Sequence, residues 1–218
     1  MISAFWEMFK PLYAVDTLEG YTENEIAYLK ELFGSLPRVL EDYYRAAGRT
    51  KAFHCVQDTW MLPEHFQKWE WLREPDYLIL LNENQGVCQA GIRREDLMLP
   101  DPPVYVTEDD KNWALCAPTA SEFLSAALAY EGVFTFEYNP EEFYWLTEEE
   151  LGLIQSKLTK LPFEMTNWLC GMRITLYSNE PDNMVAVMDC GDWGLHRDGD
   201  LQMLYGAASE ASYASLMC

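Results

Sequence analysis

Apolar residues recur every three or four positions in several stretches of the chain, as on the buried face of an α-helix. The predicted helices cover residues 22–33, 35–48, 63–73, 119–132 and 147–158, and a last one follows Gly206. Three of them open with the Thr-x-x-Glu spacing of a capping box, at Thr22, Thr119 and Thr147. We also expect Ser35 to cap the second helix. The apolar residues of the fifth helix are expected to be buried: Leu151, Ile154 and Leu158.

Between the helices, the pattern changes to short continuous apolar runs separated by turn-forming residues. These runs predict strands at residues 77–81, 87–92, 104–106 and 113–116, with turns at 82–86 and 108–112. Further strands are expected near residues 162–168, 171–178, 183–190 and 200–205. Strands and helices do not alternate strictly, which favours an α+β fold over a doubly wound sheet. Residues 137–146 resemble a junction, so we predict a core domain over 1–137 and an α+β extension over 138–218 packed on it.

Charge changes this picture more than the rest of the composition does. The chain has 36 Asp and Glu residues against 15 Lys and Arg residues, a formal net charge of −21. The excess is spread out, with −12 on residues 1–140 and −9 on residues 141–218. Such a field repels phosphate backbones and anionic membranes, so we expect neither as a partner. It attracts a basic protein, and it would also keep an aromatic-rich chain soluble.

The six cysteines are scattered, with no CxxC pair, and residues 1–7 lack the basic and apolar segments of a signal peptide. We therefore expect reduced thiols and a cytoplasmic location. Four cysteines lie among apolar residues and are expected to be small core side chains: Cys88, Cys116, Cys170 and Cys190.

No HExxH, GxSxG or GxxxxGK[ST] motif is present. His54 and Cys55 are neighbours whose side chains would diverge on a strand, which disfavours a catalytic dyad, and His65 is expected at the surface. Residues 192–200, which include His196, are rich in oxygen ligands but lack the order and closing Glu of an EF-hand, so we interpret them as a solvated turn. We predict no enzyme, no cofactor and no metal. An enzyme stays an alternative that a pocket holding His196 with two carboxylates would support.

Carboxylates at turns are the candidate binding groups. Residues 148–150 fill a first helical turn, where acids favour the helix dipole. Glu83 and Gln85 lie between two strands and either hold the turn or form a contact surface; we favour the first. The predicted partner-binding residues are the acidic tip and the later loop: Glu108, Asp109, Asp110, Asp192, Trp193 and Asp198.

Several segments also occur in a familiar order. They are LPRVLEDYYRAAG (36–48), YLI (77–79), QGVC (85–88), PVYV (103–106) and SEFL (121–124). Over about residues 22–134 this order resembles the SUKH superfamily of bacterial immunity-protein-like domains. The resemblance implies helices packed on a mixed, mainly antiparallel sheet, and it assigns no binding residue.

Many SUKH proteins resemble immunity proteins that neutralise toxins delivered between competing bacteria, often nucleases or deaminases. The resemblance therefore implies a non-enzymatic protein that binds a basic toxin, because an acidic surface can occupy a cleft built for phosphate. The alternative is an intracellular regulatory or scaffold module that binds other proteins. A toxin gene beside this one would favour the first reading.

Overall fold

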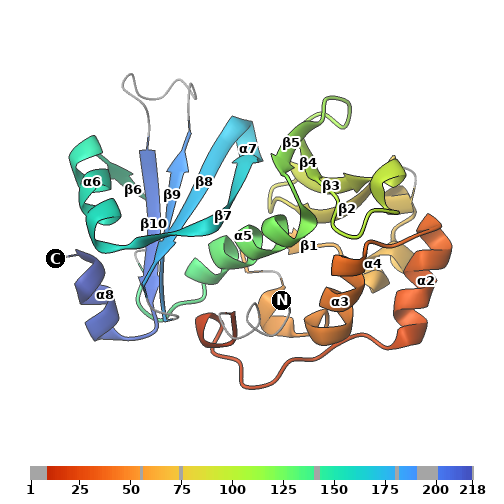
Figure 1. Cartoon of the computed structure of the whole chain (residues 1–218), viewed down its shortest axis with the longest axis horizontal. Coiled ribbons are helices and arrows are strands. Elements are labelled where there is room, and N and C mark those ends of the chain that lie inside the picture. The colour runs from red at the N-terminus through yellow and green to blue at the C-terminus, as the bar shows by residue number, and fades with distance from the viewer. Residues whose placement is uncertain are drawn as a thin grey trace. The chain divides into compact units, whose positions relative to one another are not determined.

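The computed structural model describes residues 9–54, 56–73, 76–139, 143–179, 182–190 and 201–217 (Figure 1). The chain divides into two compact units, residues 17–123 and residues 1–16 with 124–218. Each unit contains one five-stranded sheet. The predicted α+β class is confirmed. Every pairing among the described strands is antiparallel, so the parallel component that the resemblance allowed is not found in that part of the chain.

The unit of residues 17–123 opens with two helices, α2 (Glu23–Phe33) and α3 (Arg38–Ala47). As predicted, α2 starts after Thr22, whose backbone N–H donates to Glu25 at 2.9 Å, and ends at Gly34 with φ +78°. The predicted Ser35 cap is wrong. The cap position of α3 is Pro37, and the Ser35 hydroxyl instead donates to the Leu97 carbonyl at 3.1 Å.

The predicted helix over residues 63–73 breaks in two. Helix α4 (Pro63–Lys68) ends at Trp69, which has extended dihedrals, and a 3₁₀ turn, η2 (Glu70–Arg73), follows. Residues two apart on a continuous helix point in different directions. The break instead lets Trp69 and Trp71 stack at 6.4 Å. Two more 3₁₀ turns are η1 (Lys51–Phe53) and η3 (Arg94–Asp96).

The sheet of this unit runs in chain order: β1 (Thr59–Trp60), β2 (Tyr77–Asn82), β3 (Gln89–Arg93), β4 (Val104–Thr107) and β5 (Ala114–Ala117). The pattern predicted all but β1, whose two residues are too few to show a period. The core joins this sheet to the helices through aromatic side chains. Trp60 lies 6.3 Å from Tyr43 and 6.2 Å from Phe123, measured between ring centroids.

The other unit contains residues 1–16 and resumes within α5 (Ala120–Val133), which runs across the division at residue 124. Its strands are β6 (Tyr144–Leu146), β7 (Thr159–Asn167), β8 (Met172–Ser178), β9 (Asn183–Asp189) and β10 (Leu201–Ala207), in the sheet order β6-β10-β9-β8-β7. The helices are α6 (Glu148–Lys157), the short α7 (Trp168–Gly171) and α8 (Glu210–Met217). The predicted division, with a core over 1–137 and an extension over 138–218 packed on it, places the boundary at residue 137 instead and stays a prediction.

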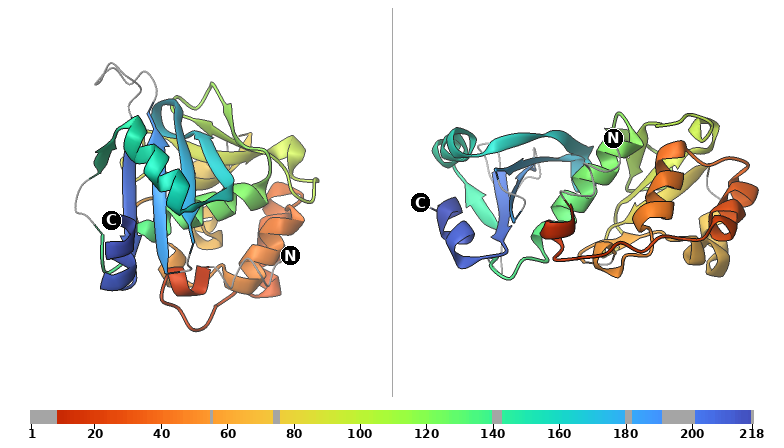
Figure 2. Two further views of the ribbon diagram at one scale, coloured as in Figure 1. Left: turned by 60° about the vertical axis from the view of Figure 1, so that its left-hand side comes forward. Right: turned by 60° about the horizontal axis from the view of Figure 1, so that its bottom comes forward.

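Helices α6 and α8 lie on the same face of this sheet (Figure 2). The capping box predicted for α6 is present, with the Thr147 backbone N–H donating to Glu150 at 2.8 Å. The apolar residues of α6 pack against the sheet but are half-buried rather than buried: Leu151, Ile154 and Leu158. Because α8 does not close over them, a hollow is left between the two helices. Among the helices of the described ranges, none is long and apolar enough to cross a membrane.

Candidate protein-binding surface

Two turns and η2 converge at one end of the sheet formed by residues 17–123. Between the β2–β3 turn, the β4–β5 turn and η2 lies a hollow of about 240 Å³, which we call the tip hollow. Its lining combines apolar and polar side chains, among them Trp71, Asn82, Val87, Gln89, Glu108 and Asp110. The surface therefore brings together segments that are separate in the sequence.

The β2–β3 turn is held from inside by two buried carboxylates. Glu83, which is 6% exposed, accepts hydrogen bonds from the backbone N–H groups of Gln85 (2.9 Å) and Val87 (3.3 Å). Asp58, which is 2% exposed, accepts one from the N–H of Asn84 at 3.1 Å. Glu83 therefore fixes the turn, as the sequence favoured, while Gln85 is exposed.

The β4–β5 turn is organised by Asp109. Its carboxylate accepts hydrogen bonds from the backbone N–H groups of Asn112 (2.7 Å) and Lys111 (3.0 Å) and from the Asn112 side chain (2.7 Å). These donors hold the pKa of Asp109 well below its usual value. Asp110 has φ +61° and accepts a hydrogen bond from the Gln89 side chain. Asp109 thus shapes the turn, while Glu108 and Asp110 line the hollow.

The other predicted partner-binding residues, Asp192, Trp193 and Asp198, lie outside the described residues. Of the three predicted residues that the structure does describe, Glu108 and Asp110 line the tip hollow, and Asp109 lies between them in the turn.

The aromatic side of the hollow comes from η2. His65 stacks on Trp69 at 4.5 Å, and Trp69 stacks on Trp71, whose side chain is 48% exposed. Val87, which also lines the hollow, is 46% exposed. Sequence reasoning assigned Trp71 to a helix and did not select it for binding. The signal available was the density of Trp in residues 69–71 beside turn-forming segments.

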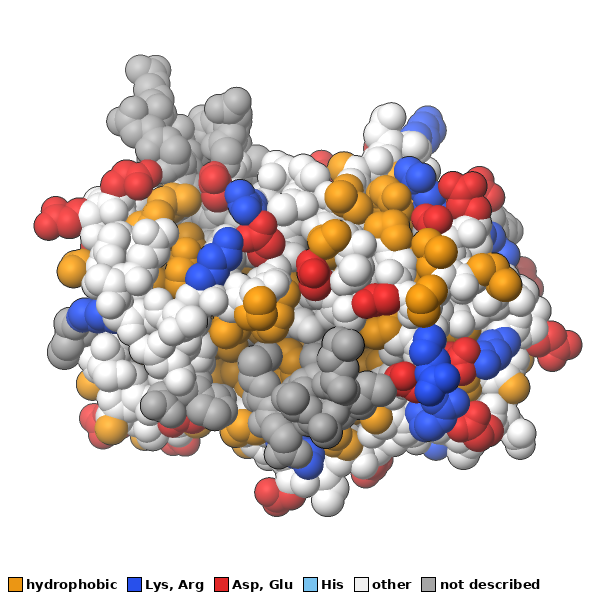
Figure 3. Space-filling view, viewed as in Figure 1, with side chains coloured by type: hydrophobic (Ala, Val, Ile, Leu, Met, Phe, Trp, Pro, Cys, Tyr) orange, Lys and Arg blue, Asp and Glu red, His pale blue; other side chains and the backbone are white. Residues whose placement is uncertain are grey.

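Basic side chains gather elsewhere in the same unit, over α2 and α3 (Figure 3). They are paired with acids: Arg45 with Glu23 at 2.6 Å, and Arg49 with Glu25 at 2.6 Å. The β4–β5 turn, in contrast, carries three carboxylates and one lysine, Lys111. The three carboxylates outnumber the one lysine, so the β4–β5 turn by itself carries a net negative charge. Over α2 and α3, by contrast, acids and bases are paired.

The candidate catalytic residues are not gathered into a site in the part of the chain that the structure describes. Cys55 and His196 lie outside it, and no cluster of three or more His, Cys, Asp or Glu side chains within it could hold a metal ion. His65, expected at the surface, is half-buried and accepts a hydrogen bond from the Leu62 N–H at 3.1 Å. Cys170, expected in the core, is instead exposed and has a φ of +57°. The other three cysteines expected in the core are buried: Cys88, Cys116 and Cys190.

His54 is largely buried, and its Nε2 atom has no hydrogen-bond partner in the described structure. Burial lowers its pKa from 6.5 to about 4, with Glu64 opposing and His65 reinforcing the shift. The unfolded chain therefore binds this proton more readily than the folded one. The contribution of neutral His54 to the free energy of unfolding is therefore complete above pH 6.5 and is lost as the pH falls towards 4.

We expect the His54→Gln variant to lose this pH dependence. Between about pH 7.5 and about pH 5, the free energy of unfolding of the natural chain should fall by about 2 kcal/mol more than that of the variant. Urea unfolding of both proteins at several pH values measures this difference. The other titrating groups contribute equally to both proteins, so their contributions cancel. Parallel curves for the two proteins would contradict the assignment.

Comparison with known proteins finds no matching family model, no matching curated protein and no matching solved structure.

Proposed function

We propose that this chain is a cytoplasmic, non-enzymatic immunity protein that binds a basic toxin domain, and that the tip hollow is its contact surface. One observation carries the proposal: Trp71 and Val87, both nearly half exposed, flank a hollow that Glu108 and Asp110 also line. The sequence resemblance to the SUKH superfamily supports the class of protein.

Such a surface can bind a partner through apolar contact and through charge. Exposed Trp side chains dominate the binding energy of many protein interfaces, where a polar rim surrounds a buried centre. Carboxylates around Trp71 would pair with Lys and Arg of a basic partner and speed association. A nuclease fits this description, because its substrate-binding surface is positively charged where it meets phosphate. The net charge of −21 adds long-range attraction.

The test is binding to toxins encoded beside this gene. Each toxin domain is purified and captured on the immobilised protein at low and at high salt, and its toxic activity is measured with and without the protein. We expect one neighbouring toxin to bind, to be inhibited, and to bind more weakly as salt screens the charges. Failure of every neighbouring toxin to bind at low salt would overturn the proposal, and capture of a cellular protein instead would favour a scaffold.

A further inference from the structure

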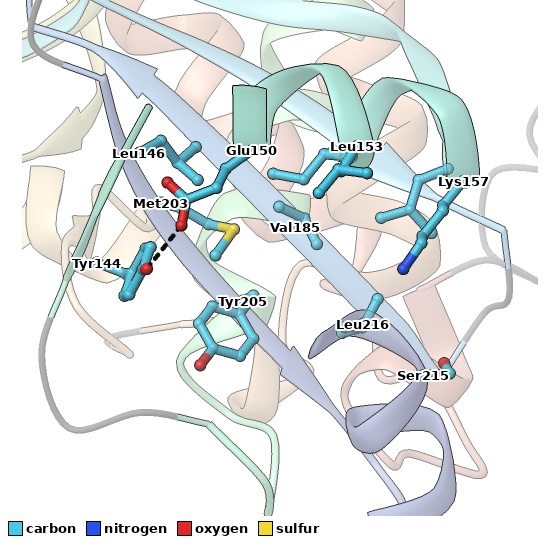
Figure 4. Close-up of a pocket in the computed structure, with 12 residues that line it drawn as sticks. Tyr144, Leu146, Glu150, Leu153, Lys157, Val185, Met203, Tyr205, Ser215 and Leu216 are labelled. Atoms are coloured by element: carbon cyan, nitrogen blue, oxygen red, sulfur yellow. Dashed lines mark hydrogen bonds between the residues drawn. The ribbon is translucent and has the colours of Figure 1, made fainter. Parts of the chain in front are cut away.

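A second hollow of about 240 Å³ lies in the unit formed by residues 1–16 and 124–218, between α6 and α8 over the sheet (Figure 4). We call it the interhelical hollow. Val185 from β9 and Met203 from β10 form its floor, and Leu153 and Leu216 extend over it from the two helices. Most of the lining is therefore hydrocarbon.

Contacts at both helices hold this hollow open. Helix α8 is anchored by Tyr213, which stacks on Tyr205 at 5.4 Å, and by the Ser212 hydroxyl, which donates to Asp182 at 2.8 Å. Helix α6 is anchored at its start, where the Tyr144 hydroxyl donates to Glu150 at 2.8 Å. Because each helix has its own attachment, neither depends on filling the space between them.

The size of the hollow limits what it can take. Ligand cavities usually measure about 300–1,000 Å³, so the interhelical hollow suits a small molecule or one chain of a larger one. An apolar chain lying over Val185 and Met203 would remove its own surface and theirs from water, which favours binding in proportion to the apolar area buried. Leu153, which is 54% exposed, would be covered as well.

Two charged side chains line the hollow, and they differ in their partners. The Glu150 carboxylate already accepts three hydrogen bonds of 2.8 Å each, from the Tyr144 hydroxyl and from both the N–H and the hydroxyl of Thr147. These donors hold its pKa below the usual value. Lys157 reaches from the other end of α6 towards α8 (Figure 4), and its ammonium group has no acidic partner among the described residues. Both groups are charged, but the oxygens of Glu150 are already taken up by hydrogen bonds, whereas the Lys157 ammonium is left to pair with a ligand.

We propose that the interhelical hollow binds a small anionic amphiphile, with its apolar chain on Val185 and Met203 and its carboxylate paired with Lys157. The pairing is a charge-assisted hydrogen bond at the edge of an apolar surface, which fixes the direction of the chain. A cationic head group would have to compete with the three hydrogen bonds that the Glu150 carboxylate already accepts, whereas an anionic one meets an ammonium group with no acidic partner among the described residues. This site is separate from the tip hollow, and its failure would leave the proposed toxin binding untouched.

The probe is decanoate, used below the concentration at which it forms micelles and followed by isothermal titration calorimetry with the whole chain. We expect saturable binding to one site and about tenfold weaker binding to the Lys157→Met variant. The matched control is Lys160→Met, because the Lys160 ammonium pairs with Glu164 at 2.8 Å outside the hollow. Its affinity should equal that of the natural chain.

Two further measurements make the result decisive. Ser215→Phe, which places a ring in the hollow from an exposed position on α8, should abolish decanoate binding while the unfolding transition is retained. Decyltrimethylammonium, with a chain of the same length and the opposite charge, should bind at least tenfold more weakly than decanoate. Absence of saturable decanoate binding, or equal binding by the natural, Lys157→Met and Ser215→Phe proteins, would overturn the proposal.

Discussion

Replacing Glu83 by alanine is expected to lower the free energy of unfolding by about 3 kcal/mol. The Glu83 carboxylate is 6% exposed and is the acceptor for the N–H groups of Gln85 and Val87. Each hydrogen bond to a charged acceptor contributes about 1.5–3 kcal/mol, and both are lost together with their buried partner. The β2–β3 turn, which carries Val87 at the tip hollow, should then lose its fixed shape.

Urea unfolding measures the change, and hydrogen exchange of the Gln85 and Val87 amides reports the turn directly. The control is Glu95→Ala, because the Glu95 side chain is 76% exposed and its N–O distance to Arg93 is 3.8 Å. This substitution should change stability by less than about 0.5 kcal/mol. If the two variants proved equally stable and the two amides kept their protection, Glu83 would not be what holds the turn.

Local sequence signals were sufficient for most of the secondary structure. The Thr22 and Thr147 capping boxes act over three residues, and the helices they predict begin where expected. Strands β2 to β5 were found from their apolar runs, because a buried strand needs only its own side chains to show the pattern. Strands β8 to β10 likewise lie within a few residues of their predicted positions.

The errors arose where partners distant in sequence decide the structure. Strand β1 has two residues and exists because Thr59 and Trp60 pair with Asn82 and Leu81. Among the strands that the structure describes, β6 pairs with β10 alone, far along the chain. The break at Trp69 is a local exception: it accompanies ring stacking with His65 and Trp71, which a helical period does not report. A single sequence carries no direct signal for such contacts.

The tip hollow shows the same limit for a site. The sequence singled out Glu108, Asp109 and Asp110 because three acids in a turn are conspicuous, but it could not separate their roles. Asp109 turns inward to the backbone of its own loop, whereas Glu108 and Asp110 line the hollow. Trp71 joins them only because η2 comes close to both turns. Composition indicated an acidic binding protein, and the tip hollow is the surface that we propose for that binding.

For the proposed toxin complex, we expect Trp71→Ala to weaken binding at least thirtyfold, a loss of about 2 kcal/mol or more. The exposed ring offers a large apolar surface to a partner, and its truncation removes that surface from the centre of the contact. The double change Glu108→Lys and Asp110→Lys should instead slow association and reduce the salt dependence, because these carboxylates attract the partner before contact. Surface plasmon resonance with the captured toxin separates the two rates.

Matched variants show whether these effects belong to the tip hollow. Met98→Ala removes a side chain that is 78% exposed, and Glu95→Lys reverses a charge in the same unit; neither residue lines the hollow. Both variants should bind like the natural chain, apart from a small effect of net charge on the association rate. Equal losses from Trp71→Ala and Met98→Ala would place the contact elsewhere. If Glu95→Lys slowed association as much as the double change at Glu108 and Asp110, the acidic tip would be only one part of a general negative field.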